Sequence, residues 1–120
     1  MLDLREYRGP DGRCPFREWF DRLNAEAARK VTTALYRLGQ GNFANAKSVG
    51  AGVSEYKINF GPGYRVYYGM DGDQIVTLLG GGTKQRQQND IRLAVDRWKD
   101  YKQRRSAEQK QGLKQQQGEE

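Results

Sequence analysis

The stretch that decides the fold is residues 55–70, which read EYKINFGPGYRVYYGM. Apolar and polar side chains alternate on both sides of Gly61-Pro62-Gly63. Strict alternation is typical of a strand with one buried face, and the glycines and proline are a strong turn signal. The stretch therefore predicts a β-hairpin that packs one face on a core.

A three-residue turn at 61–63 would fix the register of this hairpin. Apolar side chains would then lie opposite one another on the core face, as the pairs Phe60 with Tyr64, Ile58 with Val66, and Tyr56 with Tyr68. A slip by one residue would bury a lysine and an arginine together, which is costly. We therefore expect the two faces to be well determined.

The opposite face of the hairpin is polar and basic. We expect it to pair Asn59 with Arg65 and Lys57 with Tyr67, while Glu55 is near enough to neutralise a cation. One interpretation is a phosphate-binding site in which Tyr67 stacks on a base or donates a hydrogen bond. The other is a sheet face that is polar because water covers it, and the pattern favours neither.

A buried strand and a glycine-rich segment follow the hairpin. Residues 74–79, QIVTLL, are apolar on both faces, which predicts a central strand that ends at Gly80-Gly81-Gly82. The segment 80–90, GGGTKQRQQND, then precedes a helix. Such a segment either binds an anion through backbone N–H groups or is a flexible linker. The helix has one apolar stripe, formed by Ile91, Ala94, Val95, Trp98 and Tyr101.

The N-terminal half predicts a strand and a helical hairpin. Residues 2–8 indicate a short strand, 15–24 and 26–38 amphipathic helices, and 41–52 a loop. The predicted order is β-α-α-β-β-β-α, an α+β domain on a mainly antiparallel sheet. We expect this domain to span residues 1–103. The Gln-rich segment 104–120 is expected to be a helix that frays into a disordered tail.

Composition limits the chemistry. The formal net charge of +6 favours a polyanionic partner. The chain has no histidine, and Cys14 is its one cysteine, so histidine-based catalysis, an internal disulfide and a cysteine-rich zinc site are excluded. Any catalysis must use Lys, Arg, Tyr, Asp or Glu. Because no signal peptide or membrane-spanning stretch is evident, we expect a cytoplasmic protein without a membrane partner.

Three stretches in order resemble one family of toxins. They are DGRCPFREWFDRL at 11–23, KSVGAGVSEYKINFGPGYRVYYG at 47–69 and LLGGGTKQRQQNDIRLAVDRWKDY at 79–101. Together they are similar to the RelE/ParE superfamily of type II toxin–antitoxin systems, most closely to its HigB-like addiction module killer proteins. Each stretch alone would be a weak signal.

The resemblance implies an endoribonuclease that cleaves mRNA, often on the ribosome, and so inhibits translation. Cleavage would need no metal ion or cofactor, because the ribose 2′-OH attacks the adjacent phosphate. The implied partner is a cognate antitoxin, HigA-like, with a helix-turn-helix domain that alone contacts operator DNA.

The resemblance also assigns site residues. Arg65 matches an arginine that stabilises the phosphate transition state, and Lys57 a lysine that acts as base or charge stabiliser. Lys84 falls near a second basic catalytic position. Asp90 lies where relatives carry a tyrosine or acidic residue for proton transfer, although it could merely complement the helix dipole. The RNA contacts implied outside the chemistry are Lys47, Tyr67 and Arg86.

Two other functions fit the same fold. A ParE-like toxin would act on DNA gyrase without RNA chemistry, and a non-catalytic module would only bind its antitoxin or nucleic acid. The cations at positions 57, 65 and 84 favour the ribonuclease, because a gyrase-binding toxin has no need of them.

Overall fold

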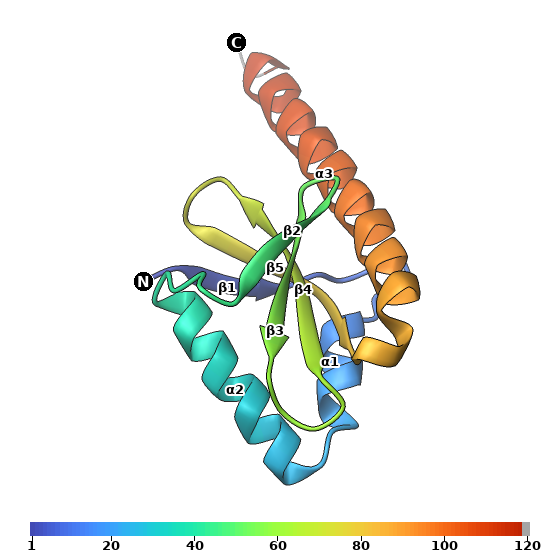
Figure 1. Cartoon of the computed structure of the whole chain (residues 1–120). Coiled ribbons are helices and arrows are strands. Elements are labelled where there is room, and N and C mark those ends of the chain that lie inside the picture. The colour runs from blue at the N-terminus through green and yellow to red at the C-terminus, as the bar shows by residue number, and fades with distance from the viewer. Residues whose placement is uncertain (119–120) are drawn as a thin grey trace.

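A five-stranded sheet forms the centre of the computed structural model, which describes the backbone of residues 1–118 and the side chains of residues 1–110 (Figure 1). The strand order is β1-β5-β4-β3-β2. The strands are β1 (Asp3–Glu6), β2 (Ala46–Gly50), β3 (Val53–Ile58), β4 (Tyr64–Asp71) and β5 (Ile75–Gly82). Only the β1–β5 pair is parallel. The predicted α+β class with a mainly antiparallel sheet is confirmed.

Helices cover both faces of the sheet. Helices α1 (Pro15–Asp21) and α2 (Ala25–Gly39) pack on one face, and α3 (Gln87–Gly118) packs on the other (Figure 1). Between β5 and α3 lies a single 3-10 turn, Lys84–Arg86. Helix α1 begins with a proline at its first position. Helix α2 is capped by the Asn24 side chain, which accepts a hydrogen bond from the Ala27 N–H at 2.9 Å.

The two faces of the sheet carry separate cores. On the α1–α2 side the buried core includes Phe16, Val31, Leu38, Tyr56, Ile58, Val66, Tyr68, Val76 and Leu78. On the α3 side it is Tyr7, Val53, Tyr67, Leu79, Ala94 and Trp98. The Trp98 ring lies so close to β4 that a Cβ at Gly69 would be 2.6 Å from it. This glycine therefore allows α3 to approach the sheet.

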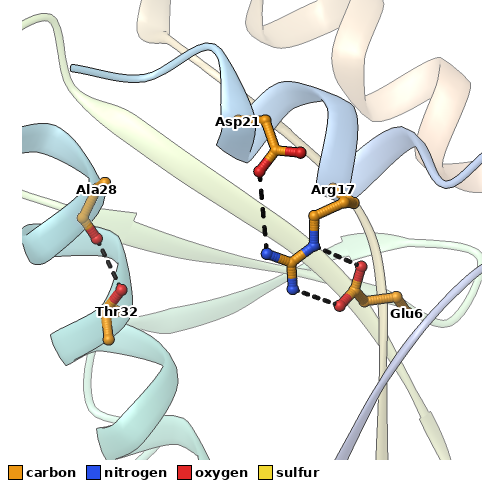
Figure 2. Close-up of polar contacts among 5 residues, drawn as sticks. All are labelled: Glu6, Arg17, Asp21, Ala28 and Thr32. Carbon is orange, nitrogen blue, oxygen red and sulfur yellow. Dashed lines mark hydrogen bonds and ion pairs between the residues drawn. The ribbon is translucent and has the colours of Figure 1, made fainter. Parts of the chain in front are cut away.

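Arg17 fixes α1 against β1. Its guanidinium donates hydrogen bonds to both carboxylate oxygens of Glu6, at 3.2 and 2.7 Å, and lies 4.0 Å from Asp21 (Figure 2). On α2, the Thr32 hydroxyl donates to the Ala28 carbonyl at 2.8 Å (Figure 2). The contact between Arg17 and Glu6 holds the end of β1 beside α1, which matters for the cleft described below.

Two strand boundaries differ from the prediction. Residues 41–52 were predicted as a loop, yet β2 pairs with β3 within them. The strand was missed because this short edge element is polar and lacks an alternating apolar pattern. Strand β5 also continues through Gly80-Gly81-Gly82 instead of ending there. Glycines are needed at this point because a Cβ at Gly81 would lie 2.3 Å from the Trp19 ring.

The predicted hairpin forms, but its register is shifted by two residues. Ile58 pairs with Tyr64 and Tyr56 with Val66, whereas the prediction paired Phe60 with Tyr64. Asn59 and Phe60 join the turn, in which the Gly63 N–H donates to the Phe60 carbonyl at 3.1 Å. A shift of two residues keeps each side chain on its expected face. It also makes Lys57, rather than Asn59, the neighbour of Arg65.

Helix α3 is longer than predicted. The segment from Arg104 was expected to fray, yet the helix runs to Gly118. Its Gln, Lys, Arg, Glu and Ala residues have high helix propensity, which accounts for the extension beyond the sheet (Figure 1). A division of the chain at 103/104 stays a prediction. None of the helices in the described residues is long and apolar enough to span a membrane.

Candidate active site

Two rows of side chains cross the α3 face of the sheet. In one row Lys57 of β3 lies opposite Arg65 of β4, which lies opposite Gly82 of β5. In the adjacent row, Lys47, Glu55, Tyr67 and Gly80 lie side by side on β2, β3, β4 and β5. The sheet register thus brings together four residues that the sequence assigned to the site.

Arg65 is the buried member of the first row. It is 4% exposed, its Nε donates to the Glu55 carboxylate at 3.3 Å, and its Nη1 donates to the Gly63 carbonyl at 2.8 Å. A guanidinium has five N–H groups. These two bonds orient Arg65 and use two of its five N–H groups.

Glu55 neutralises this part of the site. It is 1% exposed, and besides Arg65 it accepts a hydrogen bond from Gln87 Nε2 at 2.9 Å and lies 3.8 Å from Lys47 Nζ. The expectation that Glu55 would partner a hairpin cation is confirmed. Gln87 was not predicted as a site residue, because only the packing of α3 on the sheet brings it to Glu55.

Tyr67 does not fit its predicted role. The side chain is 1% exposed, and its hydroxyl has no hydrogen-bond partner among the described residues. Burial, and then the negative charge of Glu55, raise the pKa of the Tyr67 hydroxyl, so this group stays neutral at pH 7. The prediction that Tyr67 stacks on a base is wrong for this structure, because α3 covers the ring.

Lys84 lies across the hairpin turn from Arg65. Its backbone N–H donates to the Pro62 carbonyl at 3.4 Å, and a Cβ built on Gly63 would lie 3.5 Å from Lys84 Cβ and 3.2 Å from Arg65 Nη1. The side chains of Lys57 and Lys84 are exposed. Two exposed cations therefore flank one fixed, buried cation.

Asp90 closes the same end of the sheet from above. A Cβ on Gly82 would lie 2.0 Å from Asp90 Oδ2, so the carboxylate rests directly on the glycine that is opposite Arg65. Burial raises the pKa of Asp90, and the nearby Arg86 and Arg97 partly oppose that rise. The carboxylate is in the first turn of α3, so the helix dipole also favours its charge. Both predicted roles remain consistent with this position.

Most of the predicted residues lie together, and Arg86 lies apart from them. Lys57, Arg65, Lys84 and Asp90 lie around Gly63 and Gly82, and Lys47 joins them through Glu55. Arg86 is exposed at the end of the 3-10 turn, near Asp90. Arg97 was missed, although its spacing of seven residues from Asp90 places both on one face of α3.

Together the fold and this cluster define a small α+β protein with a basic, histidine-free candidate site. Residues 18–99 match the model of the family described as phage derived protein Gp49-like, and the chain belongs to that family. It is a family of RelE/HigB-type toxins and is associated with toxin–antitoxin systems, which implies an antitoxin partner.

The chain is also similar to an uncharacterised protein of Haemophilus influenzae. The two are 41% identical over 80 residues, which cover 66% of this chain and 81% of the relative. Because the function of that protein is not described, the similarity supports the shared family and adds no activity.

Proposed function

We propose that this protein is the toxin of a type II toxin–antitoxin pair and inhibits translation by cutting mRNA, on the ribosome and without a metal ion. The observation that carries the proposal is the meeting of three cations and one carboxylate, Lys57, Arg65, Lys84 and Asp90, at one end of the sheet. Such a cluster suits a phosphate whose negative charge grows in the transition state.

In the proposed reaction the ribose 2′-OH attacks the adjacent phosphorus. The bond to the 5′-oxygen of the next nucleotide breaks, which leaves a 2′,3′-cyclic phosphate and a 5′-hydroxyl. Asp90 or Lys57 would accept the 2′-OH proton, and Lys84 would donate a proton to the leaving oxygen. Arg65, held by Glu55, would donate hydrogen bonds to the non-bridging oxygens.

The burial of Arg65 shapes this proposal. At 4% exposure, its guanidinium can meet a phosphate only at its edge, so the exposed Lys57 and Lys84 would make the outer contacts. Lys47 is exposed beside Glu55 and would position the RNA without taking part in the chemistry.

The proposed partner in the cell is a HigA-like antitoxin with a helix-turn-helix domain, which would neutralise the toxin and contact operator DNA itself. The proposed place of action is the cytoplasm, where mRNA is translated. The net charge of +6 would favour approach to the ribosome and make binding sensitive to salt.

The test is induced expression in a bacterial host with mapping of mRNA 5′ ends. Lys57→Gln and Lys84→Gln change exposed side chains and should leave the fold intact. Arg65→Ala is less suitable, because it would leave the buried Glu55 without its charge partner. The matched control is Lys99→Gln, an exposed lysine of α3 outside the cluster.

The proposal expects growth arrest and new codon-phased cuts with the unaltered chain and with Lys99→Gln. Both effects should fall at least about a hundredfold in Lys57→Gln and Lys84→Gln, the lower end of the range for an acid–base or electrostatic group. Arrest without cuts, equal in all variants, would refute the ribonuclease and direct attention to DNA gyrase.

A further inference from the structure

A cleft opens where β5 loses its neighbour β1. Strand β1 pairs with Ile75 to Leu78 only, and the last backbone contact is the Tyr7 N–H, which donates to the Leu78 carbonyl at 2.9 Å. The chain then turns away at 9–12, while β5 continues to Gly82 with a free edge. A cleft of about 720 Å³ lies against this edge. Its volume is in the usual range for ligand sites.

Four parts of the chain enclose the cleft. Gly81 lines it from β5, Trp19 and Arg22 from α1 and the residue that caps it, and Arg97 from α3. The turn after β1 contributes Gly9, Pro10 and Asp11. Because Arg17 binds Glu6, the separation between α1 and the end of β1 is fixed by the fold.

The cleft contains excess positive charge. Arg22, Arg86 and Arg97 line it, and none of them forms a salt bridge with the described residues. Of the acidic lining residues, Glu18 is already paired with Arg13, which leaves Asp11 and Asp90. Three guanidinium groups around one concavity outnumber these two carboxylates, so a further anion would be attracted to the cleft.

Arg97 shows that the site is built into the fold. It is partly buried, and its Nη1 donates to the Leu79 carbonyl at 3.0 Å. A Cβ on Gly80 would lie 2.6 Å from that nitrogen, so glycine at 80 makes room for the guanidinium. A partly desolvated cation with one neutral acceptor gains from a negatively charged ligand.

We propose that this cleft binds a phosphate and base of single-stranded RNA next to the linkage that is cut. The inference rests on the proposed function, because Asp90 lies both in the cleft and over Gly82, beside Arg65. An RNA with one phosphate at Lys84 would thus continue past Asp90 to the arginines that line the cleft. Trp19 and the exposed Leu93 provide apolar surface for a base, and Asn89 provides polar groups for its edge.

The test measures binding separately from cutting. The probe is a single-stranded RNA with 2′-O-methyl riboses, which lacks the nucleophile, and fluorescence anisotropy gives its Kd at several salt concentrations. Arg22→Gln removes an exposed cation of the cleft, and Arg97→Lys removes the planar donor group but keeps the charge. Arg29→Gln on the exposed face of α2 is the matched control, and circular dichroism checks folding.

We expect each cleft variant to raise Kd about tenfold, and Arg22→Gln to lower the salt slope by about one, while Arg29→Gln changes neither. With unmodified RNA, Arg29→Gln should retain the kcat and KM of the unaltered chain, whereas Arg22→Gln should raise KM. No RNA binding, or an unchanged Kd in Arg22→Gln, would overturn the inference. The inference would also be overturned if the cleft variants bound RNA normally but lost binding to an acidic peptide. The cleft would then be a protein-binding site.

The proposed function can fail separately. If the unaltered chain binds RNA and Arg22→Gln weakens that binding, but unmodified RNA is never cut, the cleft stands and the nuclease does not.

Discussion

The Glu55 carboxylate and the Arg65 guanidinium form a buried ion pair, with 3.3 Å between Oε1 and Nε and side-chain exposures of 1% and 5%. Two charges this deep are costly to desolvate, and the remaining oxygen of Glu55 is satisfied by Gln87. The pair therefore joins the centre of the sheet to the first residue of α3. Any variant of Arg65 changes both the candidate chemistry and this junction.

The first prediction separates those two effects. Arg65→Gln should destabilise the fold by about 3–5 kcal/mol, because it leaves Glu55 charged and buried. The double variant Glu55→Gln with Arg65→Gln should lose clearly less than the sum of the two single variants, as urea unfolding would measure. Additive losses would mean that the pair contributes nothing to folding.

The second prediction concerns the buried hydroxyl of Tyr67. Tyr67→Phe should keep or raise the free energy of unfolding, by up to about 1 kcal/mol, because an unpartnered buried hydroxyl is unfavourable. The pKa of Tyr67 is higher in the folded state than the unfolded value of 10.0. Ionisation of Tyr67 therefore does not affect the free energy of unfolding below pH 10, and lowers it as the pH rises further. Thermal melts of both proteins from pH 7 to 11 check this. A loss above 1 kcal/mol at pH 7 would reveal a partner for the hydroxyl.

The third prediction uses Asp90. Its folded pKa is raised above 3.8, so the folded state holds its proton more tightly, and stability falls as the pH rises from the unfolded to the folded pKa. Asp90→Asn removes this ionisation, and its stability relative to the unaltered chain should increase across that window. Urea unfolding between pH 3 and 7 measures the difference. If Asp90 is the base, the acid limb of the cleavage rate also disappears in the variant. A stability difference that does not change with pH would contradict the raised pKa.

Which features followed from the sequence is clearest in the hairpin. Alternation around Gly61-Pro62-Gly63 predicted both strands and their faces, because a strand's period of two depends only on local order. The register was wrong by two residues, since nothing local shows that Asn59 and Phe60 join the turn. Strand β2 was missed because its stability comes from pairing with β3 and not from its own composition.

The candidate site was predicted only in part, because local patterns identify residues but do not show how α3 packs on the sheet. Lys57, Arg65, Lys84 and Asp90 were identified from the hairpin pattern and the family resemblance, and the register places them together. The burial of Arg65 and Tyr67 depends on α3 covering that face, which is tertiary packing that a strand pattern does not encode. The unpaired arginines of the cleft come from the C-terminal cap of α1, the 3-10 turn and α3, and they meet only after folding.

The fourth prediction tests the close contact between β5 and α3. Gly82→Ala would place a Cβ 2.0 Å from Asp90 Oδ2, so the start of α3 must move, at a cost of about 1–3 kcal/mol. Cleavage should fall with stability, because Asp90 leaves its position over the Arg65 row. Gly39→Ala is the control, since its Cβ would meet only Leu4 Cδ1 at 3.4 Å. Equal melting temperatures for the two variants would show that α3 adapts freely.

The last prediction places the end of the folded domain. Arg104 donates hydrogen bonds to Asp100 and to the Arg8 carbonyl, and Arg105 lies 3.1 Å from Asp71. Removal of residues 107–120 keeps these contacts and should change stability by less than about 0.5 kcal/mol. Removal of residues 104–120 loses them and should cost about 1–2 kcal/mol, because each exposed ion pair contributes little. Urea unfolding of both truncations distinguishes the cases. A loss already present in the shorter truncation would mean that α3 beyond Ser106 contacts the fold, and equal stability of both would support a boundary at 103/104.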